Sequence, residues 1–451
     1  MTVPTSTGDA AIEAAPSTAT GPSWPLWQRV LLRFFFVYLL LQITPWNWFA
    51  IVPGVEALGN LWSRGVDAAV VAANRALFHV ADPLVAVNGS GDTSWAWAEL
   101  QLYLVVAAAA TLVWSVIDRR RPHHERLAWW LRLVVRYYIA TFALSYGIIK
   151  LFGLQMLFPT LSQLATPLGD FLPMRFSWMF IGYSFKYQFF SGVAETVAGV
   201  LLLYRRTVTA GLLAATGAFL NVVMINLSYD VPVKLFASHL LFACLFLLAL
   251  DAPRLLDFFV FNRPTAATVA YDLPFTHRWQ RWGAHAVKAV IVVQILILPL
   301  WNGWTRYQAA AGAQPTGPFA VGVYQVRRFV VNGTEVPYTM GDSLRWNDVI
   351  FDNSSAGSVG TRDPVFWQRY RRGYFRYATD TAAKVASVWK TSTIPGDSTF
   401  LFRMRYDVRD SMTVALHTMI RGDSVHAELV RVPRHFQLAE RQFHWISEYN
   451  R

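Results

Sequence analysis

Residues 188–250 decide the fold. They form three apolar runs: QFFSGVAETVAGVLLLYRR (188–206), VTAGLLAATGAFLNVVMINLSYD (208–230) and KLFASHLLFACLFLLAL (234–250). Each run has about the length that a helix needs to cross the hydrocarbon of a bilayer. The runs carry a few isolated polar residues, namely Glu195, Asn221, Asn226, Asp230, Lys234 and His239. Because charged groups are costly inside hydrocarbon, the ionisable members of this set are where a function is first sought.

The composition of the whole chain points to the same class of protein. Of the 451 residues, 54% are hydrophobic, and they include 19 Trp and 31 Phe, although the C-terminal third has a soluble pattern. This predicts a polytopic membrane protein with an attached domain. The formal net charge of +12 comes from arginines in short loops beside apolar runs. Such arginines are typical of topology signals and lipid headgroup contacts, so we expect the lipid bilayer as a partner and no nucleic acid.

Seven apolar runs are predicted to span the membrane as a helical domain over residues 25–313, after a disordered tail at 1–24. They cover about 30–51, 95–117, 129–152, 187–204, 208–227, 235–250 and 284–301, and an amphipathic helix within 54–95 is expected at the membrane surface. Trp46, Trp48 and Phe49 form an interfacial belt after the first run. Arginine-rich loops follow the second, fourth and sixth runs. The positive-inside rule therefore predicts an inner (plasma) membrane protein with a cytoplasmic N-terminus and an extracytoplasmic C-terminal domain.

Residues 317–451 change to alternating hydrophobicity with turn residues, which predicts an all-β domain after a boundary near 314–315. About eight strands are expected, at 323–332, 346–353, 373–380, 384–391, 399–408, 413–421, 424–432 and the aromatic tail 441–449, with a hairpin turn at Gly422-Asp423. A small barrel or curved, lipocalin-like sandwich fits this pattern. A ligand cup and a barrel filled by its own side chains are equally compatible with it.

Helical rise converts sequence position into depth and places most of the polar residues in the outer third of the membrane. We expect a polar pocket that opens outward, with Glu195 at its floor, Asn221, Asn226 and His239 around it, and Lys150 and Lys234 as its cationic rim. Glu195 and His239 are the candidate catalytic residues, and the candidate ligand contacts are Lys150, Asn221, Asn226, Asp230 and Lys234. The structural alternative is that Glu195 bonds Asn221 or a lysine to lock the bundle, while the lysines reach to water and the asparagines join helices. Asp230 and Lys234, four residues apart, are expected to pair.

The order of motifs over about 130–256 resembles the DoxX-like family of four-helix membrane proteins. The motifs are GIIKLFG, SGVAETVAGVLLLYRR and FLNVVMINLSYDVPVK, and the intramembrane glutamate and following glycine of that family correspond to Glu195 and Gly199. Lys150 corresponds loosely to polar residues at the outer helix ends of the family. The resemblance implies an association with membrane redox chemistry, because some relatives are subunits of a thiosulfate:quinone oxidoreductase. A more distant likeness, in architecture only, is to vitamin K carboxylase-like membrane enzymes.

Three functions follow as hypotheses. The first is a quinone-linked redox subunit or accessory protein, in which Glu195 handles protons and a partner protein supplies electrons. The second is a non-enzymatic, membrane-anchored protein whose β domain captures a small ligand. The third, anion transport through the cationic rim, lacks the inverted repeats and broken helices typical of transporters. Nucleotide, zinc-protease and thiol-redox motifs are absent from the sequence.

Overall fold

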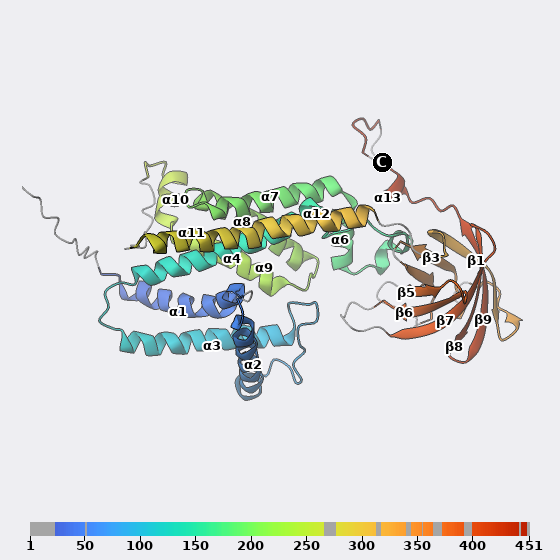
Figure 1. Ribbon diagram of the computed structural model, residues 1–451, viewed down its shortest axis with the longest axis horizontal. Coiled ribbons are helices and arrows are strands. Elements are labelled where there is room, and N and C mark those ends of the chain that lie inside the picture. Colours follow the sequence, from blue (N-terminus) through green and yellow to red (C-terminus); the bar gives the residue numbers. More distant parts are fainter. Residues whose placement is uncertain are drawn as a thin grey trace, which may run out of the picture.

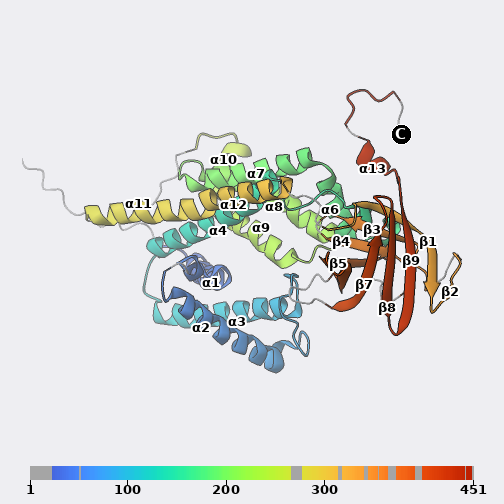
Figure 2. The same ribbon diagram turned by 45° about the vertical axis from the view of Figure 1, so that its right-hand side comes forward.

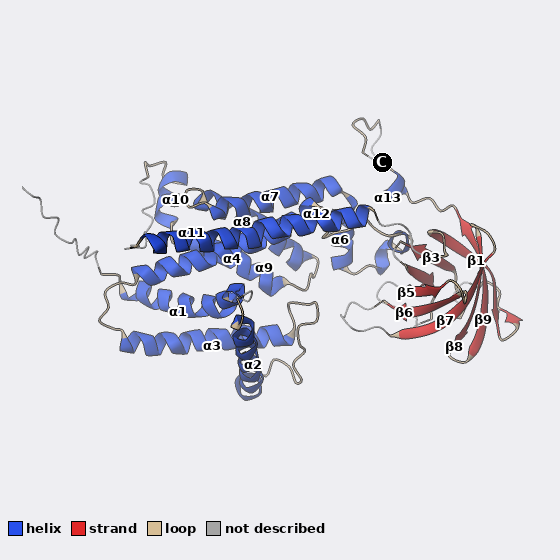
Figure 3. Ribbon diagram, in the orientation of Figure 1, coloured by secondary structure: helices blue, strands red, loops and turns tan. Residues whose placement is uncertain are grey.

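The structure is a computed structural model that describes residues 23–49, 52–265, 277–312, 317–339, 344–353, 355–363, 372–391, 399–441 and 443–448. Helices and strands separate into an N-terminal helical bundle and a C-terminal β-barrel (Figure 3). The predicted fold class, a polytopic helical bundle followed by an all-β domain, is confirmed. The predicted tail before residue 23 and the boundary at 314–315 lie outside the described residues.

The long helices of the bundle run side by side, with the barrel beyond one end (Figures 1 and 2). They are α1 (Leu26–Ile43), α3 (Ser94–Ile117), α4 (Glu125–Leu151), α7 (Phe185–Leu203), α8 (Val208–Ser228), α9 (Lys234–Ala249), α11 (Arg278–Val292) and α12 (Leu298–Ala311). A π-helical turn, η4 (Val293–Ile297), joins the last two. The shorter or steeply inclined elements are α2 (Val55–Ala73), α5 (Leu161–Leu164), α6 (Pro173–Tyr183) and α10 (Ala252–Phe259).

The chain is a multi-pass membrane protein. Within the described residues, five helices are long and apolar enough to cross a membrane, namely α1, α3, α4, α8 and the continuous segment Arg278–Ala311. A sixth is added if α9 and α10, which meet at a bend of 78°, count as one span. Seven spans were expected. The expected fourth span is α7, whose hydropathy is lowered by Lys186, Gln188 and Glu195, yet α7 packs along α4 and α8.

Helices α4 and α7 form the most extensive helix pair, because glycines let their backbones approach. A Cβ atom added at Gly192 would lie 2.8 Å from the carbonyl oxygen of Gly147 and from the amide nitrogen of Leu151. A Cβ atom at Gly199 would lie 2.7 Å from Cγ of Leu144. Small residues at such contacts are the usual device for packing helices inside a membrane.

The arginine-rich loop between α3 and α4 lies at the end of the bundle opposite the barrel (Figure 1). Arg33 of α1, only 1% exposed, donates to the carbonyl oxygen of Asp118 at 2.9 Å and contacts Nε2 of His124 at 3.1 Å. These contacts fix the loop to the first helix. We call this end of the bundle the arginine end and the opposite end, where α4 finishes and α7 begins, the barrel end.

The β domain is a closed antiparallel barrel. Its strands are β1 (Gly322–Val331), β3 (Asp348–Asp352), β4 (Ala356–Gly360), β5 (Gly373–Asp380), β6 (Val385–Lys390), β7 (Phe400–Val408), β8 (Thr413–Ile420) and β9 (Asp423–Val432), and β2 (Thr334–Glu335) extends the first hairpin. Each strand of the eight pairs with the next, and β1 also pairs with β9. This last pairing joins the two ends of the sheet.

Seven of the eight expected strands are present, and the eighth is not the one expected. Strand β4, with the sequence AGSVG, was missed because small residues give little alternation. The aromatic tail was expected to be a strand, but its described residues are not in one, and the helix α13 (Gln437–Glu440) precedes it. The turn of the last hairpin is also one residue earlier than expected. Ile420 pairs with Asp423, so Arg421 and Gly422, both at positive φ, make the turn.

Aromatic side chains pack the barrel interior. Phe319 stacks on Phe351 with ring centroids 4.2 Å apart, and it meets Tyr377 and Tyr406 edge to face. All four belong to one cluster of buried residues drawn from every barrel strand. Of the two alternatives compatible with the sequence, the structure has a barrel filled by its own side chains.

The connection between α4 and α7 fastens the barrel to the bundle. On it, the amide of Ser162 donates to Oδ1 of Asp352 at 3.2 Å, and the hydroxyl of Ser358 donates to that of Ser162 at 2.7 Å. Arg372 donates to the Ser358 hydroxyl at 3.0 Å and forms an ion pair with Asp348. Helix α5 therefore docks on β3 and β4 through a buried polar network rather than through apolar contact alone.

The glycine packing of α4 against α7 is testable by adding one methyl group. Gly192→Ala places a Cβ against backbone atoms of α4, which cannot move aside as a side chain can, so we expect a loss of about 1–3 kcal/mol in stability. Thermal unfolding of the purified protein in detergent, followed by circular dichroism, measures this. Gly217→Ala on α8 is the control, because a Cβ there meets nothing within 4 Å. Equal stability of the two variants would refute close packing at Gly192.

The docking of α5 is expected to depend on pH. Burial raises the pKa of the Asp352 carboxyl, although hydrogen bonds from Ser162 oppose the shift. A carboxyl whose folded-state pKa is raised contributes stability that is complete below its unfolded pKa of about 3.9 and is lost as the pH rises through the folded-state value. Thermal stability should therefore fall with rising pH over this range, and less so in Asp352→Asn. The exposed Asp230→Asn is the control, and pH profiles of Asp352→Asn and wild type that coincide would contradict the expectation.

Candidate functional site

An ion pair between Lys150 and Glu195 is buried between α4 and α7. The side chains are 7% and 3% exposed, respectively. Lys150 lies in the last turn of α4, and Glu195 lies in the middle of α7. Oε1 of Glu195 accepts the hydrogen bond from Nζ of Lys150, whereas Oε2 is buried and has no hydrogen-bond partner among the described residues. Oε2 of Glu195 is therefore a buried acceptor without a hydrogen bond from the described part of the chain. Leaving such an atom unpaired away from water costs free energy.

The sequence of α7 explains why the carboxylate meets this lysine. Gln188, Gly192, Glu195 and Gly199 share one helix face, and this face packs on α4. Gly192 lies one turn before Glu195, and a Cβ there would be 2.9 Å from Cβ of Lys150. The glycine thus makes room for the lysine stem beside the carboxylate.

Gln188 fixes the start of the same helix face. Its side-chain oxygen accepts from the amide of Met156 at 3.1 Å, and its side-chain nitrogen donates to the carbonyl of Met156 at 2.7 Å. Gln188 is only 1% exposed. This two-bond clamp fastens α7 to the connection that follows α4, and so holds Glu195 at a constant height relative to Lys150.

An aromatic column runs along α4 towards this pair. Tyr138, Phe142 and Tyr146 are spaced four residues apart, with ring centroids 5.0 Å and then 6.4 Å from each other. Phe236 of α9 packs edge to face on Phe142 at 4.8 Å. The column and Phe236 therefore join α4 to α9 through aromatic contacts.

His239 bonds a residue of its own helix and Tyr38 of α1, and not Glu195. Its Nδ1 lies 2.7 Å from the carbonyl oxygen of Leu235, and its Nε2 lies 2.5 Å from the hydroxyl of Tyr38. Because a carbonyl only accepts, Nδ1 carries the proton and Nε2 accepts from Tyr38. The histidine therefore joins α9 to α1.

Lys234 and Asp230 form the expected ion pair, 2.7 Å apart, at the start of α9. Asp230 is 82% exposed, so the pair faces outward.

A third residue near the start of α9, Asp92, was not singled out in the sequence. Its carboxylate accepts the backbone amides of Lys234 at 2.8 Å and Leu235 at 2.9 Å, and thereby caps α9 from a distant loop. Its position in the loop sequence GSGD gave no signal of the helix that it caps.

The two asparagines of α8 have different surroundings. Asn226 is buried, and its side-chain nitrogen donates to the carbonyl oxygen of Val233 at 3.4 Å, which ties the end of α8 to the start of α9. Asn221 is exposed on the outside of the bundle. It was expected beside Glu195, but it lies on a face of α8 that does not turn towards Glu195.

Six of the seven polar residues therefore fall into two groups and not one pocket, and the exposed Asn221 belongs to neither. Lys150 and Glu195 form the buried group, whereas Asn226, Asp230, Lys234 and His239 gather at the start of α9, each with its own partner. The expectation of an outward-opening pocket with Glu195 as its floor is wrong in this respect, because Lys150 covers the carboxylate. The candidate roles of the seven residues remain predictions.

Part of the chain is similar to a bacterial relative. Over 83 residues it is 36% identical to the Uncharacterized protein YwoB of Bacillus subtilis (strain 168), a match that covers 18% of this chain and 54% of that protein. The chain thus spans about half the length of this relative. No protein-family model matches the chain, and no solved structure matches it. The DoxX-like resemblance therefore remains a prediction.

The ion pair predicts an asymmetric effect of mutation. Lys150→Met leaves the Glu195 carboxylate buried without a counter-charge, so we expect a loss of about 3–5 kcal/mol, which the double variant Lys150→Met/Glu195→Gln should largely recover. Lys234→Met removes a partly exposed lysine from its pairs with Asp230 and, at 3.7 Å, with Asp92, and it should cost about 1 kcal/mol or less. Thermal unfolding in detergent measures all three. A double variant as unstable as Lys150→Met would show that the two charges are not coupled.

Proposed function

We propose that the helical domain is a quinone-linked accessory subunit of a membrane redox system, with Glu195 as the group that exchanges protons. The observation that carries the proposal is the buried Glu195 carboxylate, with one oxygen paired to Lys150 and the other without a partner. If Glu195 only held the two helices together, we would expect both of its carboxylate oxygens to have hydrogen-bond partners. A group that must take up and release a proton benefits from a free acceptor atom.

Lys150 acts as a positioning residue in this proposal. Its ammonium holds one oxygen of the carboxylate and compensates the negative charge, so that the free oxygen is presented in a fixed orientation. The fit to a quinone rests on the aromatic column of Tyr138, Phe142 and Tyr146, since a flat, lipophilic head group packs well on aromatic rings. A quinone, when bound, supplies the electron chemistry and takes up or releases protons with it.

The electrons come from a partner protein in this proposal. The described residues contain no group of three or more His, Cys, Asp or Glu side chains that could hold a metal ion. The arginine end is placed in the cytoplasm, following the positive-inside rule, and the barrel on the outer side. The barrel would then be the part of the protein that a soluble partner meets.

Ligand capture by the β domain is the weaker candidate. A lipocalin-like site needs an open interior, but Phe319, Phe351 and Tyr377 occupy that space and contact one another. A vitamin K carboxylase-like enzyme has no support beyond the shared architecture. The quinone-linked proposal is preferred because it uses a buried carboxylate, one oxygen of which has no hydrogen-bond partner among the described residues.

The proposal is tested by Glu195→Gln, which keeps the size of the side chain and its hydrogen bond with Lys150 but cannot exchange a proton. In membranes that contain the whole protein, we expect oxidation of a short-chain quinol, per amount of accumulated protein, to fall by about a hundredfold or more. Immunoblotting of the same membranes measures accumulation.

Two controls separate proton exchange from a structural lock. The exchange variant Lys150→Glu/Glu195→Lys retains an ion pair and should restore stability where Lys150→Met does not, while quinol oxidation stays low. Glu56→Gln on α2 removes an exposed carboxylate with no assigned role and should leave quinol oxidation unchanged. Full quinol oxidation by Glu195→Gln membranes would overturn the proposal.

A further inference from the structure

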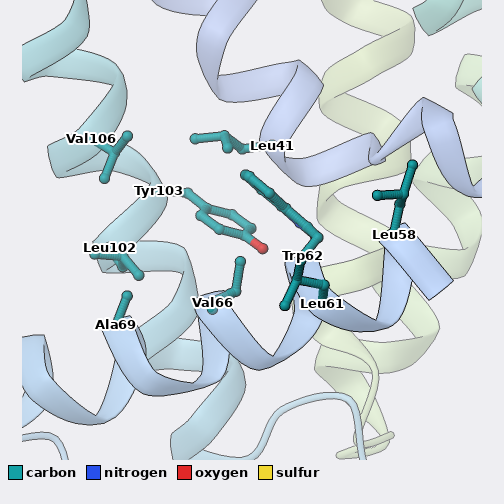
Figure 4. Close-up of a pocket in the computed structure, with 10 residues that line it drawn as sticks. Leu41, Leu58, Leu61, Trp62, Val66, Ala69, Leu102, Tyr103 and Val106 are labelled. Carbon is teal, nitrogen blue, oxygen red and sulfur yellow. The ribbon is translucent and has the colours of Figure 1, made fainter.

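A cavity of about 520 Å³ lies between α1, α2 and α3, away from the Glu195 site. Figure 4 shows Tyr103 and Trp62 in its middle, with Leu41 of α1 above them. The lining is apolar except for the Tyr103 hydroxyl, which already donates to Oε1 of Glu99 at 2.9 Å. This volume is in the usual range of small-molecule sites, about 300–1,000 Å³.

Helix α2 places the cavity at the membrane boundary. It crosses α3 instead of running alongside it (Figure 1). Its residues Leu58, Leu61, Trp62 and Gly65 recur at helical spacing on the face that lines the cavity. Glu56, Asn60, Arg64 and Asp67 are exposed on the opposite face. An amphipathic helix of this kind lies in the plane of the headgroups, so the cavity beneath its apolar face lies at the level where acyl chains begin.

A second observation points to a ligand with a polar end. An adjoining cavity of about 490 Å³ shares Leu58 and Trp62 with the first and is also lined by Trp46. Nε1 of Trp46 is buried and has no hydrogen-bond partner among the described residues. A buried indole N–H without an acceptor is unusual, since such donors normally find one. An acceptor that is not part of this chain would satisfy it.

We propose that this double cavity binds one membrane phospholipid. One acyl chain occupies the space between Leu41, Trp62 and Tyr103, and an ester carbonyl oxygen accepts the hydrogen bond of Trp46. Trp46 follows the end of α1, which is the depth of the ester groups in a bilayer. A quinone head group would need several polar contacts to be oriented, whereas a hydrocarbon chain needs none, and the first cavity has only the Tyr103 hydroxyl, already engaged.

Two substitutions test the two ends of the site. A Cβ added at Gly65 meets nothing within 4 Å, so Gly65→Leu can direct a side chain into the cavity. Trp46→Phe removes the donor and keeps most of the ring. The full-length protein is purified, stripped of lipid by detergent exchange and titrated with palmitoyl-oleoyl phosphatidylglycerol, and native mass spectrometry measures the bound lipid. We expect Gly65→Leu to bind about tenfold more weakly than wild type, and Trp46→Phe several-fold more weakly.

Gly283→Leu on α11 is the matched control, because that position is also a helical glycine with open space around it. It should bind the phospholipid as wild type does. Circular dichroism of each variant establishes that it folds, and Gly65→Ala, which adds only one carbon, should retain most binding. Equal binding by Gly65→Leu and wild type would overturn the proposal. Displacement of the phospholipid by a stoichiometric amount of ubiquinone would also overturn it, because the site would then belong to a quinone.

Discussion

The close approach of α4 and α7 is the constraint on which the rest of the molecule depends. Gly147, Gly192 and Gly199 remove the side chains that would hold the two helices apart, and this brings Lys150 against Glu195. The same pair of helices is joined by the connection that carries α5, and α5 is the part that docks on the barrel. The site in the membrane and the position of the β domain are therefore set by one helix contact.

The helical part was predictable because hydrophobicity over a long run needs no tertiary information. The expected second span ended at Ile117, where α3 ends, and the expected fifth began at Val208, where α8 begins. The number of membrane spans was harder to predict, because α7 does not stand out by its hydropathy. It is held in the bundle by packing that buries Glu195. In the barrel, strands with strong alternation were found, while AGSVG was not, because a strand of small residues is recognised only by its neighbours.

The candidate site shows where sequence reasoning stops. Glu195 and Lys150 could be picked out as costly charges, but their pairing depends on glycines that make sense only when two helices are seen together. His239 forms a hydrogen bond with Tyr38, which lies 201 residues away in the chain. No local sequence pattern predicts such a distant partner. Asn221 was misplaced because the rotation of α8 about its axis was not predicted. Depth follows from counting residues, whereas rotation is decided by packing.

The pairing of β1 with β9 has a consequence for how the β domain can meet other molecules. An open sheet offers unpaired backbone groups to which a foreign strand can be added, and such edges also promote aggregation. Here the eight long strands pair in succession and β1 also pairs with β9, so among the described strands only the two-residue β2 lies at an edge. Recognition at the wall must therefore operate through side chains and loops. The domain can offer a large surface beyond the membrane and still resist polymerising with its own copies.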